Sequence, residues 1–209
     1  MRLILVRHGR TRSNVGFLLD TGVPGADLDD TGREQAHGLV ERLAEHPIEA
    51  IYASTLVRTQ QTAAPLAAVR NLPVEVLPGL REISAGDDEL ASDATRYIGT
   101  LMRWQSGDLA ARIPGGENAM EFFERFDEAL ATVAANAHEA AMLVSHGAAL
   151  RVWSSARVDG FSAALGAGHL ANTGVIVIDG SVDAGWRLAS LDGVLTFEGF
   201  SFDPEAFED

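Results

Sequence analysis

Short apolar runs alternate along the chain with stretches in which apolar residues recur at every third or fourth position. The runs have the length of buried strands, and the other stretches are typical of helices that pack on such strands. Strands are predicted from the runs at 3–6, 48–53, 74–77, 141–144, 175–178 and 186–191. The last two are expected to pair as a hairpin across residues 179–185.

Helix signals follow several of these runs. Thr31–Glu34 has the sequence of a capping box, and a helical stripe of apolar residues follows it. Ser54 is predicted as the N-cap of the next helix, which Pro65 is expected to kink or break. A long amphipathic helix with its phenylalanines in the core is predicted from the stripe Phe122, Phe123, Phe126, Leu130 and Val133.

This order of elements predicts the α/β class, as a three-layer α/β/α sandwich with a mostly parallel sheet. The length of 209 residues and the 46% of hydrophobic residues favour a single domain over residues 1–209. Residues 84–116 fit no strand, and we expect a helical insertion there that caps one end of the sheet. The acidic segment 203–209 is expected to be a frayed tail.

Charge and composition narrow the function. The formal net charge of −14 argues against nucleic acid and anionic membranes as partners, because both require a basic face. The first nineteen residues nevertheless contain four arginines and no acidic residue, which favours a small anion bound there. The absence of lysine and cysteine excludes Schiff-base and thiol chemistry and Cys-ligated zinc. With no apolar run of signal-peptide or membrane-span length, a cytoplasmic location is expected.

Polar residues follow the ends of the predicted parallel strands. In open sheets of this kind ligands bind beyond the carboxyl ends of the strands. The residues expected to meet there are Arg7, His8, Gly9, Ser54, Arg58, Arg81, Glu82, Ser145, His146 and Gly147. Two of these turns share the order strand, His, Gly. This repetition is stronger evidence for a functional site than either histidine alone.

Six segments in order resemble the histidine phosphatase superfamily, also called phosphoglycerate mutase-like. They are "VRHGRTRSN", "LDDTGREQA", "YASTLVRTQQTA", "LREISAG", "PGGEN" and "LVSHG", and the resemblance spans about residues 1–180. Each motif is weak alone, but six in the family's order are specific. The resemblance implies the phosphoglycerate mutase-like fold and catalysis without metal or other cofactor.

The resemblance also implies a role for each matching residue. His8 would attack phosphorus and become phosphohistidine, and Glu82 would give and then take a proton. The phosphoryl group would be held by Arg7, Arg58, His146, Asn14 and Gly147. Planar guanidinium groups suit this task because they bind two phosphate oxygens at once. Asp87 and Asp88 are reserve candidates for the proton donor, and a salt bridge with Arg81 is the structural alternative for Glu82.

Two departures from the family pattern leave the substrate open. Arg10 stands where many relatives have Glu, and a solvated surface arginine is favoured over a contact to a second anionic group of the substrate. The segment "GDDEL" lacks the Trp and the last Gly of the family's Gly-x-Trp-Glu-Gly, so the cap over the pocket differs.

Three functions compete on this evidence. A phosphomonoesterase for a small phosphorylated molecule is favoured over a phosphoglycerate mutase, because Ala148 stands where those mutases have Asn. A non-catalytic phosphate-binding module is disfavoured because such a protein would usually have lost one of the central residues. Here all five are present: Arg7, His8, Arg58, Glu82 and His146. The oligomeric state stays open.

Overall fold

The computed structural model describes residues 1–136, 139–166 and 168–195. In this part of the chain seven strands form one sheet in the order β3-β2-β4-β1-β6-β7-β5. The strands are β1 (Arg2–Arg7), β2 (Ile48–Ala53), β3 (Val74–Val76), β4 (Ala140–Ser145), β5 (Val158–Asp159), β6 (His169–Ser181) and β7 (Gly185–Leu195). Strands β3, β2, β4 and β1 run parallel, whereas β6 is antiparallel to both β1 and β7. The predicted strands, the hairpin and the mostly parallel sheet are confirmed.

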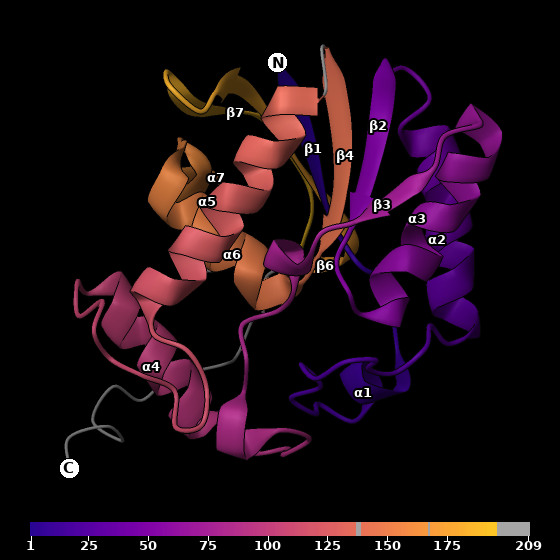
Figure 1. The fold of residues 1–209 in the computed structure, drawn as a ribbon. Coiled ribbons are helices and arrows are strands. Elements are labelled where there is room, and N and C mark those ends of the chain that lie inside the picture. Colours follow the sequence, from indigo (N-terminus) through magenta and orange to yellow (C-terminus); the bar gives the residue numbers. More distant parts are fainter. Residues whose placement is uncertain (137–138, 167, 196–209) are drawn as a thin grey trace.

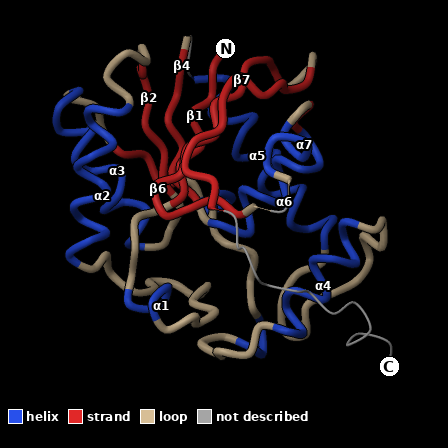
Figure 2. The backbone as a smooth tube through the Cα atoms, turned by 180° about the vertical axis from the view of Figure 1, so that it is seen from behind, coloured by secondary structure: helices blue, strands red, loops and turns tan. Residues whose placement is uncertain are grey.

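Helices cover both faces of this sheet. They are α1 (Arg12–Val15), α2 (Asp30–Arg42), α3 (Val57–Arg70), α4 (Thr95–Gln105), α5 (Ala119–Asn136), α6 (Gly147–Arg157) and α7 (Phe161–Leu165), with short 3₁₀ turns η1 (Pro78–Leu80) and η2 (Gly86–Asp88). Figure 1 shows α2 and α3 on one face and α5, α6 and α7 on the other, and the view from behind in Figure 2 agrees. The expected three layers are therefore present.

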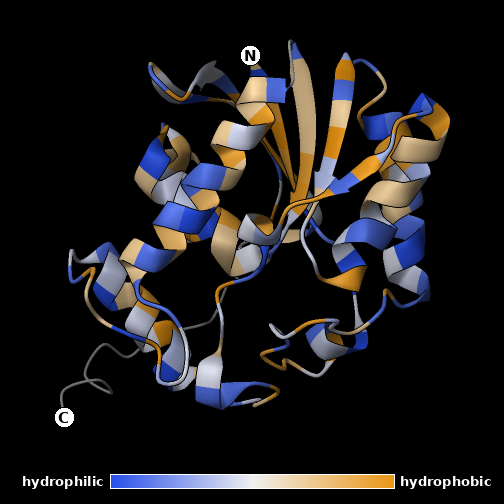
Figure 3. Cartoon of the chain, in the orientation of Figure 1, coloured by the Kyte–Doolittle hydropathy of each residue, from blue (hydrophilic) through white to orange (hydrophobic). Residues whose placement is uncertain are grey.

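The central strand β1 is buried on both faces, which explains its unbroken apolar sequence. Leu3 and Leu5 pack in the cluster that contains Phe122, Phe126 and Trp153, under α5 and α6. Ile4 and Val6 point the other way, into the cluster under α2 and α3. Apolar residues accordingly gather on the strands and hydrophilic ones on the outer helix surfaces (Figure 3). Phe122 and Phe126 are in the core as predicted, whereas Phe123 is partly exposed.

The segment 84–116 contains η2 and α4 and lies beyond the carboxyl ends of the parallel strands, as does α1 (Figure 1). This placement agrees with the expected helical insertion over one end of the sheet. The predicted frayed tail 203–209 lies outside the described residues. No helix in the described ranges has the length and apolar character needed to span a membrane.

Two predictions of local structure are wrong. Helix α2 begins at Asp30, because the side chain of Asp29 accepts from Gly32 N and caps the helix two residues before the expected cap at Thr31. Helix α3 begins at Val57 with Leu56 as its N-cap, since the Ser54 hydroxyl is bound to His146.

Pro65 does not break α3, which continues to Arg70. The buried residues Thr62, Ala63, Leu66 and Ala67 lie on both sides of it. Packing of this face on the sheet outweighs the single backbone hydrogen bond that the proline removes.

Two glycines of α2 differ in the space available for a side chain. A Cβ on Gly32 would lie 2.1 Å from Arg10 O, because the helix start packs directly against the backbone that follows β1. A Cβ on Gly38 would meet nothing within 4 Å. The close approach at Gly32 therefore fixes the loop after His8 against α2.

We predict opposite effects of adding a methyl group at these positions. Gly38→Ala should raise the free energy of unfolding by about 0.5–1 kcal/mol, because alanine is the better helix former. Gly32→Ala should lower it by about 1–3 kcal/mol through overpacking. Urea unfolding followed by circular dichroism measures both. Equal stability of the two variants would contradict the packing described here.

Candidate active site

The residues that follow β1, β2 and β4 converge on a pocket at the carboxyl ends of these strands. The pocket has a volume of about 180 Å³. It is lined by Arg7, His8, Thr11, Ser13, Asn14, Leu18, Leu19, Asp20, Thr21, Arg58, Glu82, Tyr97, Gly147 and Ala148. Most of the predicted site residues thus line one small pocket. His146 does not line it, but its ring centroid is 5.3 Å from that of His8.

His8 is buried and oriented by its own chain. Its Nδ1 lies 2.7 Å from Gly9 O, and because a carbonyl can only accept, Nδ1 must carry the hydrogen. Nε2 is then left with a lone pair, and it has no hydrogen-bond partner among the described residues. Burial lowers the pKa of His8 well below its usual value, and the charges of Arg58 and Arg7 lower it further. Both effects favour the neutral ring, the form that carries a lone pair on Nε2.

His146 is fully buried, with both ring nitrogens engaged by the protein. Nδ1 lies 3.3 Å from Nη2 of Arg58, which can only donate, so Nε2 carries the hydrogen and donates to Ser54 Oγ at 2.8 Å. Burial, followed by the charge of Arg58, lowers the pKa of His146 well below its usual value. The neutral ring of His146 thus orients Arg58 by accepting a hydrogen bond from its guanidinium group.

Arg7 and Arg58 bring two positive charges into the pocket with part of their N–H groups unpaired. Arg7 Nη1 donates to Leu170 O at 2.5 Å, and Arg58 Nη2 donates to Asp20 O at 2.6 Å. Nε of both arginines and Nη1 of Arg58 are buried without a hydrogen-bond partner, although Nη1 is 3.5 Å from a carboxylate oxygen of Asp20. Burial lowers the pKa of each guanidinium. Unpaired buried donors of this kind are costly unless an anion binds them.

Gly147 and Asn14 shape the same end of the pocket. A Cβ on Gly147 would lie 3.1 Å from Arg7 Nε, so the glycine makes room for the guanidinium. The side-chain oxygen of Asn14 accepts from Thr11 N and from Asn172 Nδ2, each at 3.1 Å. Asn172 Nδ2 also donates to His8 O at 3.0 Å and so ties Asn14 to the backbone of His8.

The carboxylate of Glu82 is held by backbone N–H groups. It accepts from Ile83 N at 2.9 Å, and from Ala148 N and Ala149 N at the start of α6 at 3.1 and 2.7 Å. The alternative of a salt bridge between Glu82 and Arg81 is not observed.

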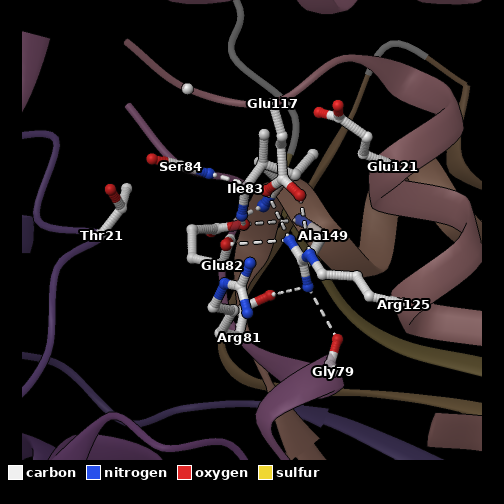
Figure 4. A network of polar contacts seen from close by, with 12 residues as sticks. Thr21, Gly79, Arg81, Glu82, Ile83, Ser84, Glu117, Glu121, Arg125 and Ala149 are labelled. Carbon is white, nitrogen blue, oxygen red and sulfur yellow. Dashed lines mark hydrogen bonds and ion pairs between the residues drawn. The ribbon is translucent and has the colours of Figure 1, made fainter. Parts of the chain in front are cut away.

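Arg125 of α5 fixes the segment that carries Glu82 (Figure 4). It donates to the carbonyls of Gly79, Arg81 and Glu82 at 2.7, 2.9 and 3.1 Å. It also pairs with Glu117, which in turn accepts from Ser84 N at 3.1 Å. The segment 79–84 is thus bound at several points to one buried ion pair.

Several candidates lie elsewhere. Arg10 is partly exposed and donates to Asp29 and Thr31, both at 2.8 Å, at the start of α2, and it does not line the pocket. Asp88 is paired with Arg96, and neither Asp87 nor Asp88 lines the pocket. Thr11, which does line the pocket, caps α1.

Sequence reasoning missed three features of the site. Asp20, Leu18 and Leu19 come from a loop without strand, helix or motif signal, although Asp20 follows directly on the acid-free segment 1–19. Ser54 was expected as a helix cap but binds His146. Asn172, which was not among the predicted site residues, supports His8 and Asn14. Only the fold brings these residues together.

No group of three or more His, Cys, Asp or Glu side chains with the spacing of a metal site occurs within the described residues. Catalysis without metal remains a prediction.

Residues 3–192 match the family model of the histidine phosphatase superfamily (branch 1), so the chain belongs to that superfamily. The adenosylcobalamin/alpha-ribazole phosphatase of Escherichia coli is 32% identical over 155 residues, which cover 70% of this chain and 73% of that protein. A probable phosphoglycerate mutase of Yersinia enterocolitica is 35% identical over 72% of this chain and 71% of its own. The PE-PGRS family protein PE_PGRS11 of Mycobacterium tuberculosis is 34% identical over 90% of this chain, which matches only 36% of that longer protein.

Solved structures agree with this assignment. A mycobacterial glucosyl-3-phosphoglycerate phosphatase superposes with a TM-score of 0.76 and 27% identity, covering 92% of this chain and 98% of its own. A putative alpha-ribazole-5'-P phosphatase of Escherichia coli superposes with a TM-score of 0.73 at 27% identity, covering 92% of this chain and 96% of its own. The comparisons confirm the expected superfamily and fold and agree with the expected phosphatase class.

The two buried histidines predict a pH-dependent stability. Each stays neutral in the folded protein but takes up a proton near pH 6.5 when unfolded. The unfolded state therefore binds more protons below pH 6.5, and stability falls as the pH is lowered, by up to about 1.4 kcal/mol per pH unit for each histidine. Urea unfolding between pH 7.5 and 5.5 should show a shallower decline for the variant His8→Asn/His146→Asn. An unchanged slope would show that these rings are not neutral by burial.

The Arg125 network predicts a separable effect on catalysis. Arg125→Lys keeps the charge but cannot make the same set of hydrogen bonds, so the segment with Glu82 should loosen. We expect kcat to fall at least tenfold with little change in KM, and the free energy of unfolding to fall by about 1–3 kcal/mol. Arg112→Lys is the matched control, because Arg112 pairs with Glu121 on the surface. A kcat unaffected by Arg125→Lys would exclude the positioning role.

Proposed function

We propose that the chain is a metal-independent phosphomonoesterase that acts on a small phosphorylated substrate through a phosphohistidine formed at His8. One observation carries this proposal: the lone pair of a neutral, buried imidazole shares a pocket with buried, unpaired guanidinium N–H groups. A nucleophile and donors for three phosphate oxygens are the parts that phosphoryl transfer requires.

In the first step the Nε2 lone pair of His8 attacks phosphorus. The bond from phosphorus to the leaving oxygen breaks, and its electron pair stays on that oxygen, which takes a proton from Glu82. The ring becomes positively charged in the phosphohistidine, and the hydrogen bond from Nδ1 to Gly9 O stabilises this charge. The tautomer fixed by the backbone is thus the one the reaction needs.

Arg7 and Arg58 supply fixed positive charge to the phosphoryl oxygens. Their unpaired N–H groups are buried, so water competes little for them and they need no reorganisation during the reaction. Asn14 adds a neutral donor, since its side-chain oxygen is already bound and its Nδ2 is left for the substrate. His146 acts by holding Arg58.

In the second step water replaces the alcohol. Glu82, now ionised, accepts a proton from water as its oxygen attacks phosphorus, and the bond between Nε2 and phosphorus breaks with its electrons returning to the ring. Inorganic phosphate leaves, and both His8 and Glu82 return to their starting states. A phosphoglycerate mutase differs only here, because the phosphoryl group passes to a second alcohol.

The first experiment is an assay of phosphate release from p-nitrophenyl phosphate and a panel of metabolite phosphates in EDTA. The wild type should turn over, whereas His8→Ala should lose at least about 10³-fold in kcat/KM because it lacks the nucleophile. His37→Ala on the exposed side of α2 is the matched control. A wild type inactive on every substrate is next tested for phosphoryl transfer between phosphoglycerates, and failure there too would leave only the binding-module function.

A further inference from the structure

Part of the pocket lining, here called the leaving-group wall, comes from two segments that are far apart in the sequence. The loop after α1 contributes Leu18 and Leu19, and the insertion contributes Tyr97. Backbone hydrogen bonds join the two segments, from Leu19 N to Ala91 O at 2.9 Å and from Leu90 N to Leu19 O at 2.8 Å. Because the attacking and leaving groups lie roughly in line, the proposed attack by His8 leaves the departing alcohol on the opposite side of phosphorus, and the inference below assigns it to this wall.

The polar groups in this wall are already satisfied by the protein. The Tyr97 hydroxyl donates to Ile83 O at 3.2 Å, so its ring is what remains for the pocket. The Thr21 hydroxyl donates to Glu89 and accepts from Ala85 N, and the Ser13 hydroxyl donates to Asp20 at 2.7 Å. Few groups are therefore left for the hydroxyls of a sugar or polyol.

The wall also lacks a cation for a second anionic group. Arg7 and Arg58 are the arginines among the lining residues, and the proposed function assigns both to the phosphoryl group. Arg10 is held at Asp29 and Thr31. A substrate carboxylate would instead lie in a pocket that already contains the carboxylate of Asp20.

Apolar side chains continue from this wall onto the surface. Leu18 is 37% exposed, and its neighbour Phe17 is 81% exposed. Leu90, on the segment hydrogen-bonded to Leu19, is 58% exposed. Phe17 and Leu90 both have left-handed backbone, with φ of +53° and +61°, which bulky residues rarely adopt. Apolar side chains are thus exposed at some cost directly beside the residues that line the pocket.

We propose, building on the phosphatase function above, that this site selects phosphomonoesters with an uncharged, apolar leaving group over polyol phosphates and phosphoglycerates. Leu18, Leu19 and the Tyr97 ring contact the leaving group, and Phe17 and Leu90 extend that contact at the mouth. Selectivity comes from removing apolar surface from water at one end while the phosphoryl group is bound at the other.

The test compares three substrates whose leaving groups are alcohols of similar acidity: 2-phenylethyl phosphate, glycerol 3-phosphate and 3-phosphoglycerate. We expect kcat/KM for 2-phenylethyl phosphate to exceed that for glycerol 3-phosphate by about tenfold or more, with 3-phosphoglycerate lowest. Preference for 3-phosphoglycerate, or equal values for the first two, overturns the inference.

Variants locate the selectivity. Leu18→Ser and Phe17→Ser should each lower the ratio of kcat/KM for 2-phenylethyl phosphate over glycerol 3-phosphate by about three- to tenfold. Val69→Ser, which changes a 66% exposed valine of α3, should leave this ratio and the activity unchanged. A ratio that is the same in all variants overturns the assigned contacts. If the wild type hydrolyses p-nitrophenyl phosphate through His8 but prefers phosphoglycerate, only the inference fails; if it hydrolyses nothing, the proposed function fails with it.

Discussion

Two arginines whose N–H groups are buried and partly unpaired are the constraint around which this end of the molecule is built. Burying a guanidinium without full pairing costs free energy, so the surrounding residues must supply what pairing they can. Asp20 and carbonyls at Leu170 and Asp20 take some of the donors. The neutral rings of His8 and His146 add no further positive charge, and Gly147 gives Arg7 its space. The donors that remain define where an anion belongs.

The strand ends of this site could be predicted from the sequence because Arg7, His8 and His146 lie within two residues of a buried apolar run. Arg7 and His8 follow Leu3–Val6, and His146 follows the run at 141–144, so finding the strands located the residues. Parallel pairing of β1 with β4 then brings both histidines to one edge. Residues that follow a strand directly in the sequence can therefore be located from the pattern of apolar and polar positions.

The supporting contacts could not be predicted in this way. Asn172 reaches His8 and Asn14 across more than 150 positions, and Asp20 reaches Arg58 from a loop with no periodicity. Capping was mispredicted for a related reason. Both Thr31 and Ser54 have the side chain of a cap, but their hydroxyls bind tertiary partners, Arg10 and His146, and the helices begin at other residues. Cap propensity depends on neighbouring residues in the sequence, whereas these partners are distant in the sequence, so only the folded structure shows them.

The chemistry and the substrate contacts rest on different parts of the fold. Sheet and helix starts hold His8, Arg58 and His146, and α5 fixes the segment of Glu82 through Arg125. The leaving-group wall comes from the loop at 17–22 and the insertion at 84–97, which are joined to each other through Leu19 and Leu90. Apart from Asp20, which holds Arg58, these two segments make none of the hydrogen bonds to Arg7, His8 or His146 described above, so their other side chains can change without displacing the proposed nucleophile. The departures of "GDDEL" from the family pattern fall in this part of the chain, where, under the proposed selectivity, a change alters which alcohol is accepted rather than how phosphorus is transferred.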